Sequence, residues 1–503
     1  MQRPPDAVIA GQGSGILANP GGEMTTTTYG DLDRHSSRLA SWLRRHVGVR
    51  QGGAVAVIPR NDAASIAAIF GVLRSGSPAL LLSPADPVAR LRSQAEAIGC
   101  EFVLRSPAVG TDVLPGSCAV PDPRTLPEDR QWRDPDLDPA ADALFFGTSG
   151  STATAKLVAQ SHYNAAVNAA AVGRHHRLRR GDRIVGCLPI HHVNGLHLTL
   201  FGTLWAGGHV LLAQDFDPLR YPEFLRGFRP RIASVVPSLL EALTATWRKP
   251  GELAGFGYFV SAAAPLSTET ARRVWQAMGV RVLQGYGLTE TTNFATMMPF
   301  GLPPEAYRRL TTDAAIPSVG VALPGNEVAV LRPDGARADP GEAGEICVRG
   351  HNVMTGYVNN PQATAEAFRG GWFHSQDLGF EVADAALGRR FVVITGRSKN
   401  IAKVSGESVS LEEMERVLLS VPEVRDAACL SRPHRFYGEE IVVAVVLTPG
   451  ARVDVRDRLR SRFPSVALPR RVVHCEAIPR TATGKILRVQ LLAALTTSDG
   501  DGQ

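Results

Sequence analysis

The sequence predicts an α/β protein with a large N-terminal domain of layered α/β subdomains plus a small β subdomain, followed by a smaller α+β C-terminal domain. Helical and strand patterns alternate through most of the first 285 residues. Short strands with Pro and Gly turns follow over 317–350, and the pattern changes again after about residue 396. A chain of 503 residues is long enough for about three folding units.

The first 140 residues alternate between the two patterns. Apolar residues recur at helical spacing over 39–46 and 66–73, while AVAVI (54–58) and EFVL (101–104) are short apolar runs typical of buried strands. This alternation predicts a layered domain with a largely parallel sheet. The Pro- and Asp-rich stretch 106–140 is predicted to be a surface connection.

Later segments complete the two domains. Residues 317–350 predict a small antiparallel β subdomain. Residues 398–503 predict a compact α+β domain, in which Ser410 and Glu413 form a capping box at a helix start. The remaining strand candidates are 143–146, 184–189, 209–213, 232–237, 257–262, 281–285, 441–447 and 471–475.

Composition and charge exclude several classes of protein. Apolar residues make up 44% and charged residues 20%, close to the globular average, so global disorder is excluded. No apolar run approaches about 18 residues, and the N-terminus lacks the pattern of a secretory signal, so we expect neither a membrane span nor secretion. The net charge of +6 is mild and forms no basic stripe, so we expect no nucleic-acid partner.

Cysteine and lysine usage are also informative. The six cysteines are scattered without a CxxC pair, which argues against a zinc cluster or a disulfide framework and favours a reducing, cytoplasmic location. Only five of the 54 basic residues are lysines, which indicates that a lysine kept in this chain serves as a point charge that arginine cannot replace. Sampling noise is the alternative. The lysines are Lys156, Lys249, Lys399, Lys403 and Lys485.

A loop rich in hydroxyls follows the strand candidate at 143–146. Backbone N–H groups, hydroxyls and one mobile cation suit a polyphosphate. The loop fails the Walker pattern, because Ala155 precedes its lysine and Leu157 follows it. On the loop alone, a polar hairpin turn stays an equal alternative. The candidate phosphate-binding residues are Thr148, Ser149, Gly150, Ser151, Thr152 and Lys156.

A second cluster, QGYGLTE at 284–290, follows another strand candidate. Gly285 and Gly287 permit a sharp turn, and Tyr286 offers a flat face for a base. Thr289 supplies a hydroxyl, and Glu290 a hard oxygen ligand for Mg²⁺. By itself, the cluster is equally an ordinary strand-end turn.

With these motifs, the chain resembles the adenylate-forming superfamily of acyl- and aryl-CoA ligases, luciferase and adenylation domains. The resemblance extends from Tyr29 to Lys485. It implies an N-terminal core of residues 1–396, a hinge at 397–400 and a mobile C-terminal domain of 401–503. The segments that resemble family motifs are 148–158, 284–290, GWFHSQDLG at 371–379, TGRSK at 395–399 and PRTATGK at 479–485.

The resemblance also implies ATP and Mg²⁺ as cofactors and a small-molecule carboxylic acid as substrate. Lys485 would bridge the carboxylate and the α-phosphate, because cations must cancel the repulsion between two anions. Asp377 would bind the ribose hydroxyls, and Arg397 the ribose or a phosphate. Thr289 and Glu290 would be catalytic, with Glu290 as the metal ligand. The segment Ala263, Ala264, Pro265 would line the adenine, although packing alone explains these alanines nearly as well.

Relatives rotate the C-terminal domain between two half-reactions, so Lys399 would lie at the hinge, and Gly406, within 403–407, in a channel for the thiol. A solvated linker is the plain alternative for Lys399. His192 resembles a gate or wall of the acid pocket, although a structural histidine is nearly as well supported. No Asp or Glu occurs from Cys187 to Gln214, so a substrate ammonium would lack a counter-charge, which favours an uncharged aryl or aliphatic acid.

Several positions depart from the family pattern. Ala153, Ala155 and Leu157 replace Gly, Pro and Gly in the phosphate loop, Ser375-Gln376 replaces Thr-Gly, and Asn400 stands where an acidic residue is frequent. We expect CoA as the acyl acceptor. An acyl carrier protein, a nitrogen nucleophile in specialised metabolism, and a catalytically silent nucleotide-binding regulator remain alternatives.

Overall fold

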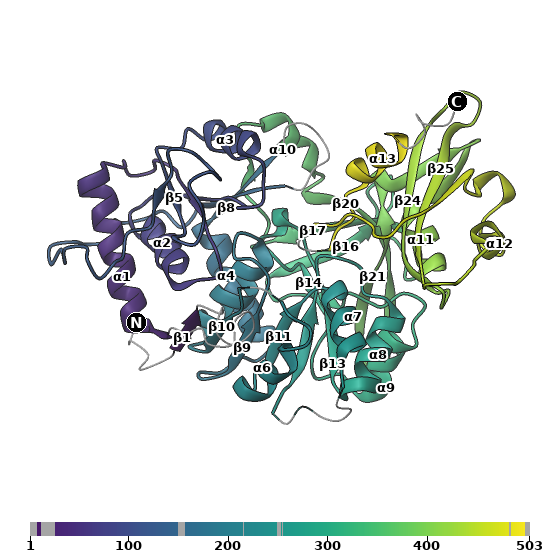
Figure 1. Ribbon diagram of the computed structural model, residues 1–503, viewed down its shortest axis with the longest axis horizontal. Coiled ribbons are helices and arrows are strands. Elements are labelled where there is room, and N and C mark those ends of the chain that lie inside the picture. The colour runs from purple at the N-terminus through teal and green to yellow at the C-terminus, as the bar shows by residue number, and fades with distance from the viewer. Residues whose placement is uncertain are drawn as a thin grey trace.

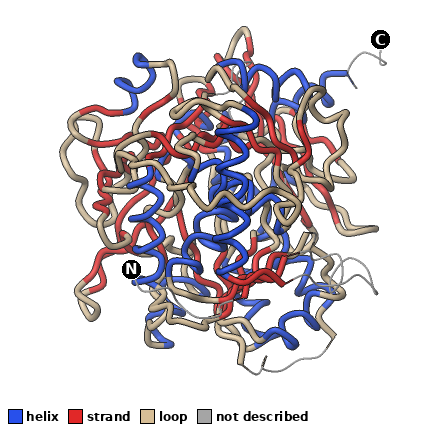
Figure 2. The backbone as a smooth tube through the Cα atoms, turned by 90° about the vertical axis from the view of Figure 1, so that its left-hand side faces the viewer, coloured by secondary structure: helices blue, strands red, loops and turns tan. Residues whose placement is uncertain are grey.

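Four β-sheets with covering helices make up the computed structural model, which describes residues 8–11, 26–148, 156–214, 216–248, 253, 255–481 and 484–497. The earliest elements lie at one end of the molecule and α11–α13 at the other (Figure 1), and helices run alongside the strands in the view turned by 90° (Figure 2). The helices are α1 (Tyr29–Trp42), α2 (Ala63–Arg74), α3 (Val88–Ala97), α4 (His162–His175), α5 (Thr203–Trp205), α6 (Tyr221–Phe228), α7 (Pro237–Thr246), α8 (Thr268–Met278), α9 (Pro304–Tyr307), α10 (Pro361–Ala367), α11 (Leu411–Leu419), α12 (Val455–Arg460) and α13 (Arg488–Thr497).

Two large sheets confirm the predicted layered α/β architecture. A seven-stranded sheet has the order β18-β8-β7-β4-β3-β5-β6, and a nine-stranded sheet the order β15-β14-β13-β12-β11-β9-β10-β1-β2. Their central strands pair in parallel and are buried along their whole length, as apolar runs covered on both faces should be. The strands are β1 (Val8–Gly11), β2 (Thr26–Thr28), β3 (Val55–Ile58), β4 (Ala79–Leu81), β5 (Phe102–Arg105), β6 (Cys118–Ala119), β7 (Asp142–Gly147), β8 (Leu157–Ser161), β9 (Arg183–Gly186), β10 (His209–Leu212), β11 (Ile232–Val235), β12 (Tyr258–Ser261), β13 (Arg281–Tyr286), β14 (Thr296–Met297), β15 (Val321–Ala322) and β18 (Gly356–Tyr357).

The small β subdomain is larger than the sequence pattern predicts. Its sheet joins β16 (Asn326–Leu331) and β17 (Gly344–Gly350) to two long strands, β20 (Trp372–Asp384) and β21 (Arg389–Arg397). The short β19 (Phe368–Arg369) pairs with β20. The subdomain therefore extends well past the predicted end at residue 350, because β20 and β21 carry polar motif residues that mask their strand pattern.

The C-terminal sheet has the order β23-β22-β25-β24, with β26 on β25, and α11 packs on β24. The Ser410 hydroxyl accepts the N–H of Glu413 at 3.2 Å, which is one of the two bonds of the predicted capping box. Of the predicted hinge, Arg397 ends β21 and Ser398–Asn400 form a short helical turn before β22, but the predicted domain boundary itself stays a prediction. The strands are β22 (Ile401–Val404), β23 (Glu407–Ser410), β24 (Val424–His434), β25 (Gly438–Leu447) and β26 (Arg471–His474).

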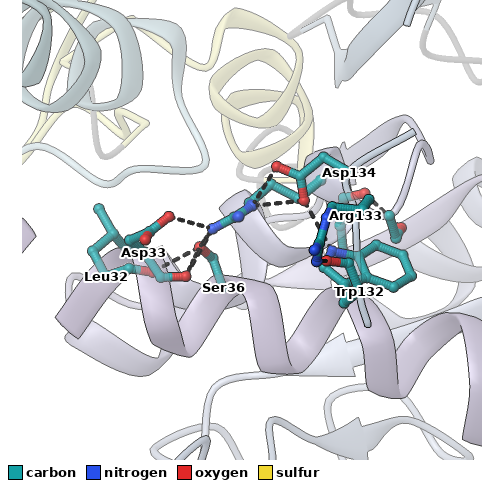
Figure 3. A network of polar contacts seen from close by, with 9 residues as sticks. Leu32, Asp33, Ser36, Trp132, Arg133 and Asp134 are labelled. Atoms are coloured by element: carbon teal, nitrogen blue, oxygen red, sulfur yellow. Dashed lines mark hydrogen bonds and ion pairs between the residues drawn. The ribbon is translucent and has the colours of Figure 1, made fainter. Parts of the chain in front are cut away.

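The predicted surface connection is tied to the body by Arg74, at the end of α2. Figure 3 shows the polar network that joins Asp33 and Ser36 to Trp132 and Asp134. The Nε of Arg74 donates to Asp134 at 3.0 Å, and its terminal nitrogen donates to Asp33 and Ser36, each at 2.9 Å. The Trp132 indole N–H also donates to Asp134 at 2.9 Å. One guanidinium therefore joins α1, α2 and the connection.

No helix in the part of the chain that the structure describes combines the length and the apolar character needed to cross a membrane. The six cysteines are all free, and Cys187, Cys347 and Cys429 are buried. Burial raises the pKa of the Cys187 thiol to about 12. The cysteines therefore contribute no cross-link among the described residues.

Candidate active site

Asp377 and Arg397 form a buried ion pair across two strands. They lie opposite each other on β20 and β21, with Arg397 Nε 2.6 Å from Asp377 Oδ1. Asp377 is only 3% exposed, and its second oxygen accepts the Tyr286 hydroxyl at 2.7 Å. Burial acts to lower the pKa of Arg397, but Asp377, Tyr286 and Glu290 together outweigh burial and raise it. The Asp377–Arg397 pair therefore links the two strands of the β subdomain, through Tyr286, to the end of β13.

The turn after β13 requires its glycines. A Cβ on Gly287 would lie 1.7 Å from the Asn293 carbonyl oxygen, so no side chain fits there. A Cβ on Gly285, near the end of β13, would lie 2.6 Å from Met297 Cε and 2.7 Å from the Phe294 ring, so these side chains would have to move. The chain then enters the single helical turn Thr289–Thr291.

Two buried amides that the sequence reasoning missed hold this helical turn. Gln160 Nε2 donates to the Thr289 carbonyl at 2.8 Å, and Asn352 Nδ2 donates to the Thr291 carbonyl at 2.9 Å. These bonds fix the backbone that presents Thr289 and Glu290. The signal available in the sequence was weak, because neither amide lies in a recognisable motif.

Tyr357, which the sequence reasoning also missed, connects two predicted site residues. Its hydroxyl donates to Glu290 Oε1 at 3.0 Å, and Lys156 Nζ lies 4.6 Å from the centre of its ring. Burial raises the pKa of the Tyr357 hydroxyl, and the Glu290 carboxylate raises it further, so it stays a donor. One side chain therefore positions both the proposed metal ligand and the cation of the phosphate loop.

Replacing Tyr357 with phenylalanine should remove the bond to Glu290 but keep the ring under Lys156. A hydrogen bond to a charged group contributes about 1.5–3 kcal/mol, so we expect about a tenfold or greater fall in acid-dependent ATP–pyrophosphate exchange and a weaker apparent affinity for Mg²⁺. Tyr163→Phe is the matched control, since the Tyr163 hydroxyl contacts His351 at the surface. Unchanged Mg²⁺ dependence in Tyr357→Phe would contradict this role.

The Lys485 loop lies against the N-terminal part of the chain. Gly484 has a φ of +82°, and a Cβ there would lie 3.4 Å from Ser238 Oγ and 3.8 Å from Ala264 Cβ. The Arg480 guanidinium, which is paired with Asp426, donates to the Gly484 carbonyl at 2.7 Å. The C-terminal part of the chain therefore presents this loop directly to the predicted adenine-side segment.

Lys485 is electrically coupled to the other predicted residues. Burial lowers the pKa of Lys485, and Arg397 lowers it further, while Glu290 and Asp377 oppose the shift. Lys485 nevertheless keeps exposed surface. Burial lowers the pKa of His192 to about 4, with a further contribution from Lys485. Glu290, Asp377 and Arg397 act electrostatically on Lys485, and Lys485 acts on His192, so the structure brings these five residues to one region, which we call the cleft.

The charge in this cleft suits a polyphosphate. Burial, then Arg397, lowers the pKa of Lys399, which adds a third cation beside Arg397 and Lys485. Two carboxylates, Asp377 and Glu290, face these three cations, which leaves an excess of positive charge for an anionic ligand. The hard carboxylate oxygens of Glu290 are of the kind that Mg²⁺ prefers. The donor set therefore fits ATP with Mg²⁺.

His192 lies in a fixed, neutral segment. Asn61 Nδ2 donates to the Leu188 carbonyl at 3.2 Å, and Asn61 Oδ1 accepts the Ile190 N–H at 3.0 Å. The His191 and His192 rings are 4.5 Å apart, and burial lowers the pKa of both. Both imidazoles are therefore neutral near pH 7.

The remaining predicted residues are placed less uniformly. The Arg90 guanidinium donates to the carbonyl of Thr148 at 3.0 Å. Ala263, which precedes Ala264 and Pro265, has a left-handed φ of +69°. Gly406 lies in the exposed turn between β22 and β23, where an added Cβ would meet nothing within 4 Å, so it is not brought to the other residues. Four predicted residues of the phosphate loop lie outside the described residues: Ser149, Gly150, Ser151 and Thr152.

Gln376, which precedes Asp377, has a φ of +62°, a conformation that suits glycine. The left-handed conformation costs a residue with a side chain about 1–2 kcal/mol, while a glycine would lose about 0.5–1 kcal/mol more conformational freedom on folding. Gln376→Gly should therefore stabilise the protein by about 0.5–1 kcal/mol in urea unfolding. Gln276→Gly, on the exposed side of the last turn of α8, is the control and should destabilise by up to about 1 kcal/mol. A loss of stability in Gln376→Gly would contradict the strain at this position.

Comparison with known families gives the class of protein. A model for the AMP-binding enzyme family matches residues 2–358, and a model for the AMP-binding enzyme C-terminal domain matches residues 413–485. The chain therefore belongs to the AMP-binding enzyme family, and it is an adenylate-forming enzyme related to acyl- and aryl-CoA ligases.

Individual relatives agree over nearly the whole chain. A feruloyl-CoA synthase from Amycolatopsis is 29% identical over 92% of this chain and 93% of its own length. The ATP-bound structure of MatB from Rhodopseudomonas palustris superposes with a TM-score of 0.81 at 26% identity, covering 95% of each chain. O-succinylbenzoate coenzyme A synthetase from Bacillus subtilis, solved with ATP and a magnesium ion, gives a TM-score of 0.79 at 26% identity over 93% of this chain and 95% of that one.

Proposed function

We propose that this protein uses ATP to activate an uncharged aryl or aliphatic carboxylic acid as an acyl-adenylate, releases pyrophosphate, and transfers the acyl group to the thiol of CoA. The observation that carries the proposal is the position of the Lys485 loop, which packs against Ser238 and Ala264 and brings Lys485 within the electrostatic influence of Glu290, Asp377 and Arg397. The CoA ligases among its relatives support the thiol acceptor.

In this proposal, each residue has a distinct task in the first half-reaction. Asp377, held by Arg397 and Tyr286, accepts hydrogen bonds from the ribose hydroxyls. Lys485 neutralises the approach of the carboxylate to the α-phosphate, where both reactants are anionic. Bound Mg²⁺, held by Glu290, would supply charge neutralisation for the phosphates. His192, neutral and partly buried, would border the acid without adding a charge there.

The second half-reaction needs the C-terminal domain to move. In the proposal, Lys485 and the Gly406 turn would move together as parts of one C-terminal domain; Gly406 lies in an exposed turn, whereas Glu290, Asp377 and Arg397 act electrostatically on Lys485. Rotation about Lys399 would withdraw Lys485 and bring the 403–407 turn to the adenylate, so that a thiol enters without exposing the intermediate to water.

A pyrophosphate-exchange screen over aromatic, fatty and amino acids tests the function. We expect exchange that depends on one class of acid, with amino acids inactive. Adding CoA or a holo-carrier protein to the preformed adenylate then identifies the acceptor. ATP binding without exchange for any acid would overturn the enzymatic proposal in favour of a silent nucleotide-binding protein.

A further inference from the structure

Three side chains with metal-binding atoms meet on the β subdomain, and none of the three belongs to the proposed nucleotide site. Cys347 Sγ lies 3.4 Å from His374 Nδ1, which lies 2.8 Å from Glu345 Oε2. The three ligand atoms all lie within 4.8 Å of one another. Among the described residues, no other group of three His, Cys, Asp or Glu side chains meets in this way.

Strand register creates this cluster. Cys347 on β17 pairs with His374 on β20, but Glu345 pairs with Leu378. Between these two pairs, β20 advances four positions, from His374 to Leu378, whereas β17 advances only two. The extra residues of β20 form a bulge. The bulge places Glu345 over His374 and leaves its other oxygen to accept the Gln376 N–H at 2.9 Å.

We propose that Glu345, Cys347 and His374 bind a divalent transition-metal ion of the Zn²⁺ class, with solvent in the fourth position. Thiolate, imidazole and carboxylate are the ligands of tetrahedral Zn²⁺ sites, and three protein ligands with one open position are typical of sites accessible to water. The site differs in chemistry from the proposed Mg²⁺ ligand Glu290, because a thiolate is too soft for Mg²⁺.

The hydrogen bonds of His374 support this assignment. Its Nε2 lies 3.3 Å from the Arg369 carbonyl, which can only accept, whereas its Nδ1 faces both the Glu345 carboxylate and the Cys347 thiol. A ring with its proton on Nε2 donates to the carbonyl and directs the Nδ1 lone pair toward the other two ligand atoms. An ion at Nδ1 leaves the Nε2 proton to donate to the carbonyl, which is the usual arrangement around a metal-binding histidine.

The cluster is both held in place and reachable. The Cys347 side chain is fully buried against Ala329, Leu331 and Trp372, whereas the side chains of His374 and Glu345 are 15% and 24% exposed. An ion can therefore enter from the Glu345 side, and binding would release the Cys347 thiol proton to solvent. Because the Gln376 N–H contacts Glu345, a bound ion would also stiffen the bulge that presents Asp377.

Titration of the metal-free full-length protein with Co²⁺ tests the proposal. We expect a thiolate-to-cobalt charge-transfer absorption that Zn²⁺ displaces. Cys347→Ser should abolish this band, and Cys475→Ser, a cysteine outside the cluster, should retain it. His374→Gln and Glu345→Gln should keep a folded protein and weaken Co²⁺ binding at least tenfold.

Absence of the charge-transfer band in the unmodified protein would overturn the proposal, as would its persistence in Cys347→Ser. If Cys347→Ser fails to fold, His374→Gln and Glu345→Gln decide, because unaltered Co²⁺ affinity in both would exclude these ligands. The test does not depend on catalysis, so its failure leaves the proposed ligase activity untouched.

Discussion

Replacing Lys485 with alanine should lower acid-dependent ATP–pyrophosphate exchange by about a thousandfold or more, a loss of about 4 kcal/mol in transition-state stabilisation. The ammonium lies in the cleft with Glu290, Asp377 and Arg397, where it would cancel the repulsion between carboxylate and α-phosphate. In the proposed mechanism, rotation of the C-terminal domain would move Lys485 out of the cleft before thiol transfer. The variant should therefore keep most of its thioester formation from supplied acyl-adenylate.

The control for this variant is Arg460→Ala, which removes an exposed cation from the same C-terminal region without touching the cleft. It should leave both half-reactions unchanged. Pyrophosphate exchange and thioester formation are measured separately for each variant. Equal losses in the two half-reactions of Lys485→Ala would contradict the mechanism, because the lysine would then act in both poses or only support the fold.

Replacing Asp377 with asparagine should raise the KM for ATP by about a hundredfold, equivalent to about 2.7 kcal/mol. The amide cannot accept from both ribose hydroxyls while it faces Arg397 and Tyr286, and it leaves the arginine without its counter-charge. Because the ribose is remote from the reacting atoms, kcat at saturating ATP should fall much less. The KM and kcat for ATP are measured in pyrophosphate exchange.

Asp384→Asn is the matched control on the same strand. Asp384 is also buried and paired with an arginine, Arg309, but that pair lies away from the cleft. Both variants should unfold more readily in urea, and only Asp377→Asn should change the KM for ATP. A similar KM change in both would show that the effect comes from a weakened strand and not from the ribose contact.

The core of the fold could be predicted because its signals are local. The strands at 55–58, 184–186 and 232–235 are short apolar runs between turn residues, and they are buried strands in the structure. Likewise, Gly285 and Gly287 were predicted from the turn that they permit, and the close approach of other atoms requires them. In contrast, β20 and β21 carry charged motif residues, so their strand character was obscured and the β subdomain was predicted too short.

The parts of the site that escaped prediction depend on pairing between distant segments. Tyr357 reaches Glu290 across 67 positions of sequence, and no local pattern encodes this contact. Cysteine spacing along the chain argued against a zinc cluster, yet Glu345, Cys347 and His374 meet because β17 and β20 are offset by a bulge. Neither the register of the two strands nor the bulge can be predicted from local patterns along the sequence.

The bond between Arg480 and the Gly484 carbonyl has a consequence for turnover. Arg480 forms an ion pair with Asp426 on β24 and donates to the carbonyl of Gly484. These contacts fix the position of the Lys485 loop relative to β24. If the C-terminal domain rotates as proposed, the lysine is withdrawn with it, and the cleft loses one unit of positive charge. The rotation that admits the thiol would therefore also weaken the electrostatic binding of the departing pyrophosphate.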